Sequence, residues 1–330
     1  MANRSSSFTS FFSILLLLST STLYVDGCYT SIISFGDSLA DTGNLKQFTS
    51  EQNQQPLHLF LPPYGETFFH QPTGRCSNGR LIIDFIAEYL NLPLVRPFFD
   101  GNVSHMMELG KGVNYAVAFA TALNSTFLEA RGVHNPITTN ISLGVQLEWF
   151  RQSICANVSD CNHLIRHSLF LMGEIGGNDY NHALLAGKSI DEIGAYVPFV
   201  IETIISAINC LNFHTYNGKI GTCWVGRQDN TSMQFFRSPG KYGFENGALK
   251  ACCGGGGSLN YNSSILCADP SSTVCAQPDT YANWDGLHLT EAAYKVISKS
   301  LLQGPYTVPQ FNSFCPTSML KERDGLSSFM

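Results

Sequence analysis

The segment YTSIISFGDS, residues 29–38, carries the pattern that decides the fold. Its first seven residues are β-prone and mostly apolar, and Gly36 ends the run, so we predict a buried strand that leads into a tight turn. This arrangement places the hydroxyl of Ser38 at the carboxyl end of the strand. Taken alone, Ser38 could equally be a helix cap, so its interpretation depends on the rest of the chain.

Predicted strands and helices alternate along the sequence. Further strands are predicted at residues 112–122 and 167–172, and helices at residues 79–92, 143–153, 190–211 and 290–302. Thr290 is the expected N-cap of the last helix. The alternation favours an α/β domain whose parallel sheet is covered by helices on both faces. Between residues 211 and 283, only residues 219–225 resemble a strand.

Composition excludes some partners. Charged residues make up 13% of the 330 residues, the net charge is −6, and Lys and Arg form no cluster. Nucleic acid and anionic membrane surfaces are therefore poor candidates. We expect one domain, residues 28–310, followed by a tail, residues 311–330.

Residues 1–27 have the features of a cleaved secretory signal. Arg4 supplies positive charge, and the apolar run of residues 8–18 is shorter than the roughly 18 residues that a membrane span requires. A membrane anchor is the alternative interpretation. We expect a secreted protein, extracellular or in a cell wall, with no stable membrane span.

Sequons and cysteines agree with secretion. Acceptor sequons occur at Asn102, Asn124, Asn140, Asn157, Asn230 and Asn262. Eleven cysteines suit an oxidising compartment, and close spacing suggests Cys155–Cys161 and Cys267–Cys275 as bridges. A zinc site at the adjacent Cys252 and Cys253 is the competing hypothesis, although no paired ligand spacing accompanies them. The glycine-rich residues 251–261 lack the Lys-Ser/Thr of a phosphate loop.

Asp285 and His288 form the second candidate for chemistry. Ser38 is a poor nucleophile unless a base, itself oriented by a third group, accepts its proton. Gly286 lies between Asp285 and His288, so the chain can bend the carboxylate back toward the imidazole. An ordinary polar loop is the alternative for this pair.

Two further segments follow predicted strands. Asn178 in residues 177–179 offers a side-chain amide to a developing oxyanion, a contribution of roughly 3 kcal/mol where such donors have been removed. The backbone N–H groups of residues 118–120, after the second strand, could point toward the same place. An ordinary Asn-Asp turn is the alternative for Asn178.

Together these segments resemble one family. Residues 35–38 with 41–44, residues 114–118, residues 176–179 and residues 285–288 are similar, in that order, to signature blocks of the GDSL, or SGNH, hydrolases, and especially to their plant secreted branch. Residues 237–256 also resemble that branch, so the similarity covers most of residues 29–305.

The resemblance implies a three-layer α/β/α flavodoxin-like fold with a parallel sheet. It implies a triad of Ser38, His288 and Asp285 that hydrolyses small-molecule or polymer esters through an acyl-serine, without a metal or organic cofactor. The oxyanion would be held by the N–H groups of Ser38 and Phe119 and by the side chain of Asn178. Asp37 and Gly177 would support the site.

The chain departs from the family in two places. Members carry glycine where this chain has Phe119, and a phenyl ring there is expected to weaken activity, because glycine serves positive φ or close ligand approach. Members also carry a long stretch between the helix predicted here at residues 190–211 and residues 237–239, and that stretch supplies further strands. In this chain only about 25 residues separate the two segments. We therefore expect a sheet lacking one or two strands. The alternative functions are a catalytically impaired extracellular binding protein and a non-functional truncated isoform.

Overall fold

The computed structural model describes residues 29–52, 56–100, 111–134, 140–157, 161–213, 234–304, 307 and 310–311. The expected signal peptide, the possible strand at residues 219–225 and nearly all of the expected tail lie outside these residues. So do Asn102, Asn230 and the side chain of Asn157.

The central sheet is parallel. In the described residues it contains β1 (Ser31–Phe35), β2 (Gly112–Asn114) and β3 (Ser168–Met172), in the order β2-β1-β3. Ile33 of β1 pairs with Val113 on one side and with Phe170 on the other. All residues of β1 are buried, as expected for a central strand flanked by parallel neighbours.

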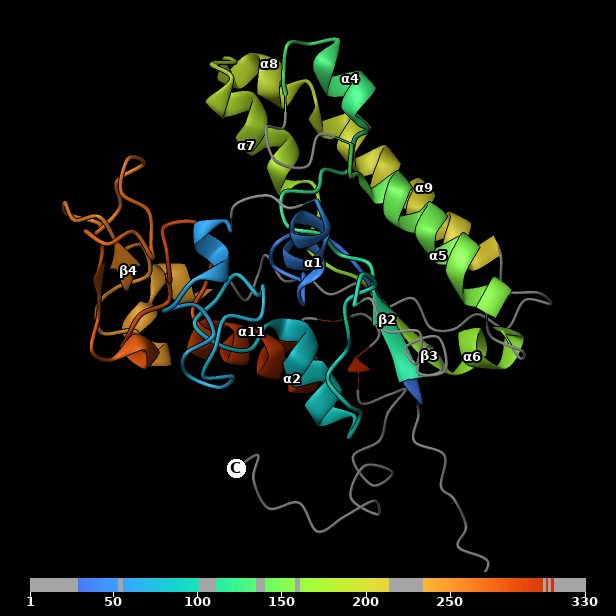
Figure 1. Cartoon of the computed structure of the whole chain (residues 1–330), viewed down its shortest axis with the longest axis horizontal. Coiled ribbons are helices and arrows are strands. Elements are labelled where there is room, and N and C mark those ends of the chain that lie inside the picture. The colour runs from blue at the N-terminus through green and yellow to red at the C-terminus, as the bar shows by residue number, and fades with distance from the viewer. Residues whose placement is uncertain are drawn as a thin grey trace, which may run out of the picture.

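Helices cover both faces of the sheet (Figure 1). α2 (Ile82–Tyr89) and α11 (Glu291–Gln303) pack together against the face that carries Ile32, Leu169 and Leu171. On the opposite face, α5 (Leu143–Asn157) and α9 (Val197–Phe213) lie side by side. They cover Ile33, Phe35 and Phe170, because successive strand residues point to opposite faces. The predicted three-layer α/β/α architecture is thus confirmed.

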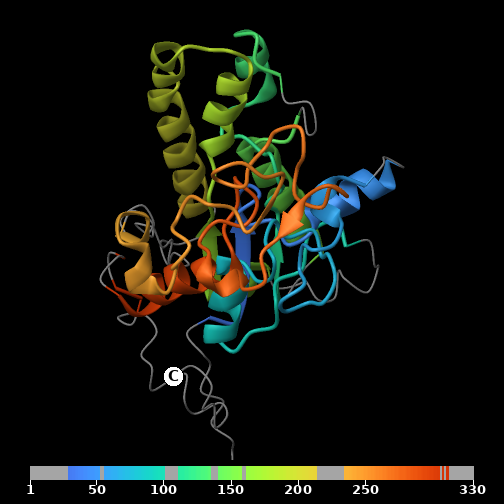
Figure 2. The same cartoon turned by 90° about the vertical axis from the view of Figure 1, so that its left-hand side faces the viewer.

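Shorter elements complete the chain (Figure 2). The helices are α1 (Asn44–Glu51), α4 (Ser125–Glu129), α6 (Cys161–His167), α7 (Gly177–Leu185) and α8 (Ile190–Gly194), with 3-10 turns at His58–Phe60, Pro239–Tyr242 and Pro278–Thr280. Strands β4 (Cys253–Gly254) and β5 (Thr273–Val274) form a small antiparallel hairpin. Within the described ranges, no helix has the length and apolar character needed to cross a bilayer.

Two predicted elements differ from the structure. The helix predicted at residues 190–211 is two helices, because α8 ends at Gly194 and α9 starts afresh with Pro198 in its first turn, where a missing N–H is harmless. The strand predicted at residues 112–122 ends as β2 at Asn114. The following backbone stays beside β1 only through single hydrogen bonds, such as Val117 N–H to Gly36 O at 3.2 Å.

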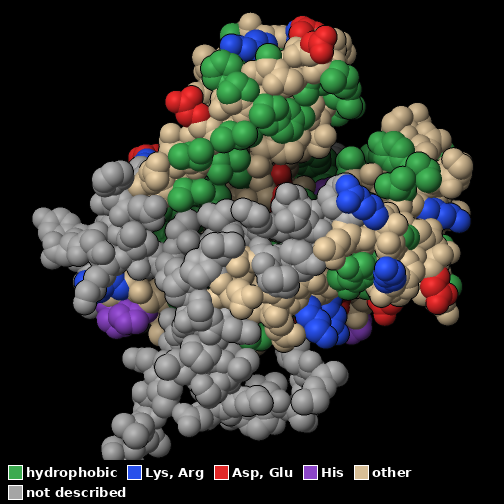
Figure 3. Space-filling model, turned by 180° about the vertical axis from the view of Figure 1, so that it is seen from behind, with side chains coloured by type: hydrophobic (Ala, Val, Ile, Leu, Met, Phe, Trp, Pro, Cys, Tyr) green, Lys and Arg blue, Asp and Glu red, His purple; other side chains and the backbone are tan. Residues whose placement is uncertain are grey.

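Within the ranges that the structure describes, the sheet ends at β3. Among the described residues β3 pairs with β1 alone, so its other edge has no strand beside it. The adjacent α9 exposes Val197, Ile201 and Ile205 by 40 to 52%. Figure 3 shows hydrophobic side chains along this helix. Both observations agree with the expectation that family strands are absent.

The disulfides correct one prediction. Cys252 is bonded to Cys275 and Cys253 to Cys267, so the predicted Cys267–Cys275 bridge is wrong. The β4–β5 hairpin is the reason, because it brings the N–H of Cys275 to the carbonyl of Cys252 at 2.8 Å. The zinc alternative at Cys252 and Cys253 is also wrong, since both sulfurs are consumed.

Two other cysteines differ in state. Cys161 is disulfide-bonded. Its predicted partner Cys155 has a side chain outside the described residues, so that pairing stays a prediction. Cys76 is a free, buried thiol.

Candidate active site

Ser38 lies half-buried in the turn that follows β1. The side chain of Gln146, from α5, brackets the peptide of Gly36: its Oε1 accepts the Gly36 N–H at 2.9 Å and its Nε2 donates to the Gly36 carbonyl at 2.8 Å. The N–H of Asp37 donates to Glu174 O, beyond β3, at 2.8 Å. The backbone before Ser38 is therefore fixed from two elements. Sequence reasoning missed Gln146, because nothing in a helical pattern marks it.

The turn after β2 is tied to the turn after β1. The carboxylate of Asp41 accepts the N–H groups of Gly43 at 2.7 Å, Asn44 at 2.6 Å and Ala118 at 2.8 Å. Phe119 follows with φ of +67°, a left-handed conformation that favours glycine. This backbone angle gives a physical reason for glycine at this position in the family that the sequence resembles.

Asn178 lies beside the same turn. It is in the first turn of α7, and its Nδ2 donates to the carbonyl of Ala120 at 3.0 Å. The neighbouring Asp179 accepts two N–H groups from residues 122–123, which clamps α7 onto the segment after Phe119. Gly177, the first residue of α7, has open space where a side chain would be. The structure thus brings Asn178 next to Phe119.

Asp285 and His288 meet through a tight turn. Oδ2 of Asp285 lies 2.7 Å from Nδ1 of His288, and Oδ1 accepts the N–H groups of Leu287 at 2.9 Å and His288 at 2.7 Å. Gly286 adopts φ of +98°, and a side chain there would collide with the ring of Tyr261. The turn therefore requires glycine, and the carboxylate folds back onto the imidazole as the spacing predicts.

Burial and charge set the ionisation of this pair. Burial alone would raise the pKa of Asp285, but the charge of His288 and its hydrogen bonds hold that pKa well below its usual value. Burial would lower the pKa of His288, yet the Asp285 carboxylate raises it well above its usual value. When His288 is protonated, the two groups form an ion pair that stabilises the imidazolium, which is the role of the acid in a catalytic triad.

Two residues that the sequence did not single out touch the pair. The hydroxyl of Tyr64 donates to Oδ2 of Asp285 at 2.7 Å. The Cys76 thiol lies against His288, and burial raises the pKa of this thiol. Tyr64 follows the two prolines at positions 62 and 63 and Cys76 lies in a polar stretch, so no sequence signal marked either residue as part of a site.

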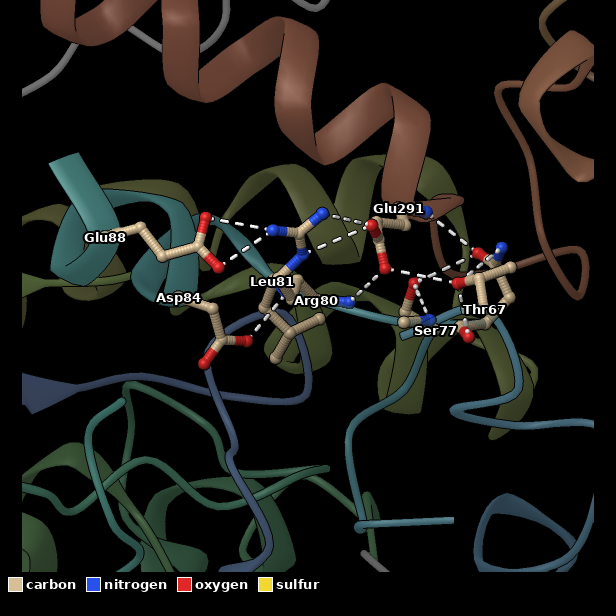
Figure 4. A network of polar contacts seen from close by, with 9 residues as sticks. Thr67, Ser77, Arg80, Leu81, Asp84, Glu88 and Glu291 are labelled. Atoms are coloured by element: carbon tan, nitrogen blue, oxygen red, sulfur yellow. Dashed lines mark hydrogen bonds and ion pairs between the residues drawn. The ribbon is translucent and has the colours of Figure 1, made fainter. Parts of the chain in front are cut away.

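An ion-pair network holds the start of α11 close to His288. Arg80 binds Glu88 of α2 at 2.8 Å and Glu291 of α11 at 2.6 Å (Figure 4). The hydroxyl of Thr67 donates to Glu291 at 3.1 Å, and Asn78 accepts the Glu291 N–H at 2.8 Å. Thr290 caps α11 through the N–H of Ala293 at 3.2 Å, as predicted. Residues 64–80 thus supply the main anchor of the segment that bears His288.

Within the described part of the chain, the candidate nucleophile Ser38 and the candidate base His288 are not bonded to each other. Among the described residues, no hydrogen bond joins the Ser38 hydroxyl to His288. Burial raises the pKa of Asp37, and the charge of His288 opposes that rise, so the imidazole lies within electrostatic range of the residue before Ser38. The structure unites Asp285 with His288 and Phe119 with Asn178, and places Ser38 at the end of the strand between the two loops that follow β2 and β3.

Some predicted glycosylation acceptors are described. Asn124 caps α4 by accepting the Phe127 N–H at 2.8 Å, and its side chain is exposed. Asn140 is exposed, and Asn262 is half-buried and accepts the Ser264 N–H at 2.9 Å.

Comparison with known proteins gives one consistent result. The family described as GDSL-like lipase/acylhydrolase matches residues 32–226. Three GDSL esterase/lipases of Arabidopsis thaliana are 42 to 43% identical, over 89 to 91% of this chain and 88 to 90% of their own lengths.

The alignments also reveal a difference in length. One of them spans 362 residues yet covers 91% of this 330-residue chain, which is about 300 residues. About 60 aligned positions of that relative therefore have no counterpart here. This agrees with the expected internal deletion.

Proposed function

The chain belongs to the GDSL-like lipase/acylhydrolase family, and from that premise we propose that it is a secreted carboxylic ester hydrolase in which Ser38 attacks, His288 is the base and Asp285 orients it. The observation that carries the proposal is the buried 2.7 Å contact between Asp285 and His288. It lies at the carboxyl ends of parallel strands, where α/β proteins bind ligands.

The reaction proceeds in two balanced steps. Ser38 Oγ attacks the ester carbonyl while His288 Nε2 takes its proton and then passes it to the departing alkoxide, leaving an acyl-serine. Water then attacks the acyl carbon while His288 takes its proton, and His288 returns that proton to Ser38 Oγ as the acyl–Oγ bond breaks and the acid leaves. Asp285 stabilises the imidazolium in both steps, so no metal or organic cofactor takes part.

The oxyanion of each tetrahedral intermediate needs donors. We assign the N–H groups of Ser38 and Phe119 and the Nδ2 of Asn178 to this role. The bond from Asn178 to Ala120 supports the assignment, because it aims the amide at the turn that contains Phe119. One N–H of the amide remains for the substrate, since Nδ2 carries two hydrogens. Asp37 and Gly177 support the turns on which Ser38 and Asn178 lie.

Hydrolysis of a short p-nitrophenyl ester by the purified protein tests the proposal. We expect turnover that Ser38→Ala lowers by at least about 1,000-fold, since the covalent route is lost. Ser34→Ala is the matched control, because Ser34 lies on the same strand and its buried hydroxyl has no partner among the described residues. Equal rates for the two variants would refute the role of Ser38.

A second function has an observation in its favour. Phe119, a proposed oxyanion donor, has a left-handed backbone that a bulky residue disfavours, and about 60 aligned positions of a relative have no counterpart in this chain. A chain that binds esters without turning them over is the alternative proposal. Saturable binding of an ester with no product, by a protein that melts cooperatively, would favour it.

Secretion is part of the proposal as well. The disulfides Cys252–Cys275 and Cys253–Cys267 support it, because such bonds persist in oxidising compartments. Mass spectrometry of protein secreted by plant cells tests it through the mature N-terminus near residue 28 and through glycans at the sequons.

A further inference from the structure

The hydroxyl of Tyr64 and the ring of His288 share one acceptor. Both approach Oδ2 of Asp285 at 2.7 Å. The other oxygen, Oδ1, is already occupied by the backbone N–H groups of Leu287 and His288. Both oxygens of the Asp285 carboxylate therefore accept hydrogen bonds from the protein. Among the described residues, Tyr64 and His288 are the side chains that bond to this carboxylate.

The position of the Tyr64 hydroxyl is itself fixed. The ring is 1% exposed and meets Trp284, the residue before Asp285, edge to face at 5.9 Å. The N–H of Gly65 donates to Ser77 O at 3.0 Å, which joins the Tyr64 loop to the segment that carries Cys76. The contact with Trp284 and the bond between the two loops therefore hold the phenol of Tyr64 against Asp285.

We propose that Tyr64 is a positioning residue of the hydrolase, which holds the Asp285 carboxylate and so sets the basicity of His288. This inference rests on the proposed roles of Asp285 and His288. The phenol remains a donor throughout the working range, because burial and the Asp285 charge raise the pKa of Tyr64 well above its usual value.

The chemical consequence follows from where the charge is placed. A hydrogen bond from Tyr64 neutralises part of the negative charge on Oδ2. Without it, Asp285 attracts the His288 imidazolium more strongly, and the pKa of His288 rises. Proton transfer from His288 to the leaving alkoxide then becomes slower, while binding of the ester itself is unaffected.

Other titratable groups face the pair and stay in place when Tyr64 is changed. His58 lies near Asp285 and His288, the Cys76 thiol touches His288, and Asp37 lies within electrostatic range of His288. Tyr294 of α11 lies within range of Asp285. Because these groups are common to the variant and the unaltered protein, a change in His288 titration reports on the Tyr64 hydroxyl.

The test is the NMR titration of the His288 imidazole, assigned by its disappearance in His288→Gln. In Tyr64→Phe, which keeps the ring and removes only the hydroxyl, we expect the pKa of His288 to rise by about one, as for the loss of one hydrogen bond to a charged group. Tyr115→Phe is the matched control, because it removes a buried hydroxyl bonded to Ser153 at 2.6 Å, away from Asp285. An unchanged His288 pKa in Tyr64→Phe would overturn the proposal.

Turnover supplies an independent readout. For Tyr64→Phe we expect kcat to fall about tenfold with KM unchanged, and the acid limb of the kcat/KM profile to move to higher pH. A fall in kcat with an unmoved limb contradicts the proposal and indicates a packing role. The titration requires no turnover, so an inactive chain with a shifted His288 pKa refutes the esterase function while supporting the role of Tyr64.

If Tyr64→Phe does not fold, the protein with its unaltered sequence can be expressed with 3-fluorotyrosine in place of tyrosine. Fluorination makes the phenol of Tyr64 a stronger hydrogen-bond donor, so the pKa of His288 is expected to fall. An unchanged His288 pKa under these conditions contradicts the proposal.

Discussion

The N–H of Ala118 donates a 2.8 Å hydrogen bond to the carboxylate of Asp41, and this bond ties the turn after β2 to the turn after β1. Asp41 is fully buried and accepts three further N–H groups of its own turn, so it cannot move with Ala118. The backbone that enters Phe119 is thereby fixed. The left-handed φ of Phe119 is thus imposed by its surroundings, against the preference of a bulky residue.

Replacing Phe119 by glycine is expected to raise turnover. Glycine adopts a φ of +67° without strain and leaves room for the acyl group beside the N–H donor. We expect kcat for a p-nitrophenyl ester to rise several-fold. Phe127→Gly, at a half-buried position on α4, is the control for loss of a phenyl ring. No gain in kcat for Phe119→Gly would show that the ring does not limit the reaction.

Ester hydrolysis is expected to increase toward alkaline pH. Asp285 raises the pKa of His288 well above its usual value, so the fraction of His288 that can act as a base grows as pH rises toward that pKa. Asp285→Asn removes the charge, and the limb of the kcat/KM profile then moves to lower pH while the maximal rate falls by orders of magnitude. A limb that stays in place in Asp285→Asn would contradict the ion pair.

Asp37→Asn is expected to change how stability depends on pH. Burial raises the pKa of Asp37 to about 8 against a hydrogen bond from the Leu39 N–H, and the charge of Glu174 adds to the rise. Between about pH 4 and pH 8 the unfolded chain has released this proton and the folded chain has not, so stability falls as pH rises, by about 1 kcal/mol per pH unit. Denaturant unfolding at several pH values should show a flatter dependence in Asp37→Asn, whereas the exposed Asp191→Asn should follow the unaltered protein. Parallel curves for the two variants would show that Asp37 ionises normally.

Glu291→Gln is expected to lower both stability and activity. The change leaves Arg80 with only Glu88 as an ionic partner and weakens the anchor of the segment that bears His288. We expect the melting temperature to fall by a few degrees and kcat to fall more than KM changes. Glu148→Gln, whose pair with Arg151 is exposed, is the control and should have little effect. Equal melting temperatures and equal kcat values for the two variants would contradict this anchoring role of Glu291.

Local patterns predicted much of this molecule. The strand before Ser38, the glycine-bent turn from Asp285 to His288 and the cap at Thr290 depend on neighbours in sequence, and the structure has all three. The covering of both sheet faces by helices followed from the alternation of strands and helices.

Contacts between distant segments could not be predicted in the same way. Gln146 meets Gly36 across 110 residues and Tyr64 meets Asp285 across 221, and neither side chain differs in sequence from an ordinary helical or loop residue. The prediction of the cysteine pairing failed for a related reason. Spacing favoured Cys267–Cys275, but the hairpin register decided the partners.

The central claim is that Ser38 is an activated nucleophile, and labelling with a fluorophosphonate tests it most directly. The probe phosphonylates a serine only when a base takes its proton. We predict one probe per chain, mapped by peptide mass spectrometry to Ser38, faster at pH 9 than at pH 6 and absent in His288→Gln. A chain that melts cooperatively yet never labels at Ser38, or labels equally in His288→Gln, would contradict the account.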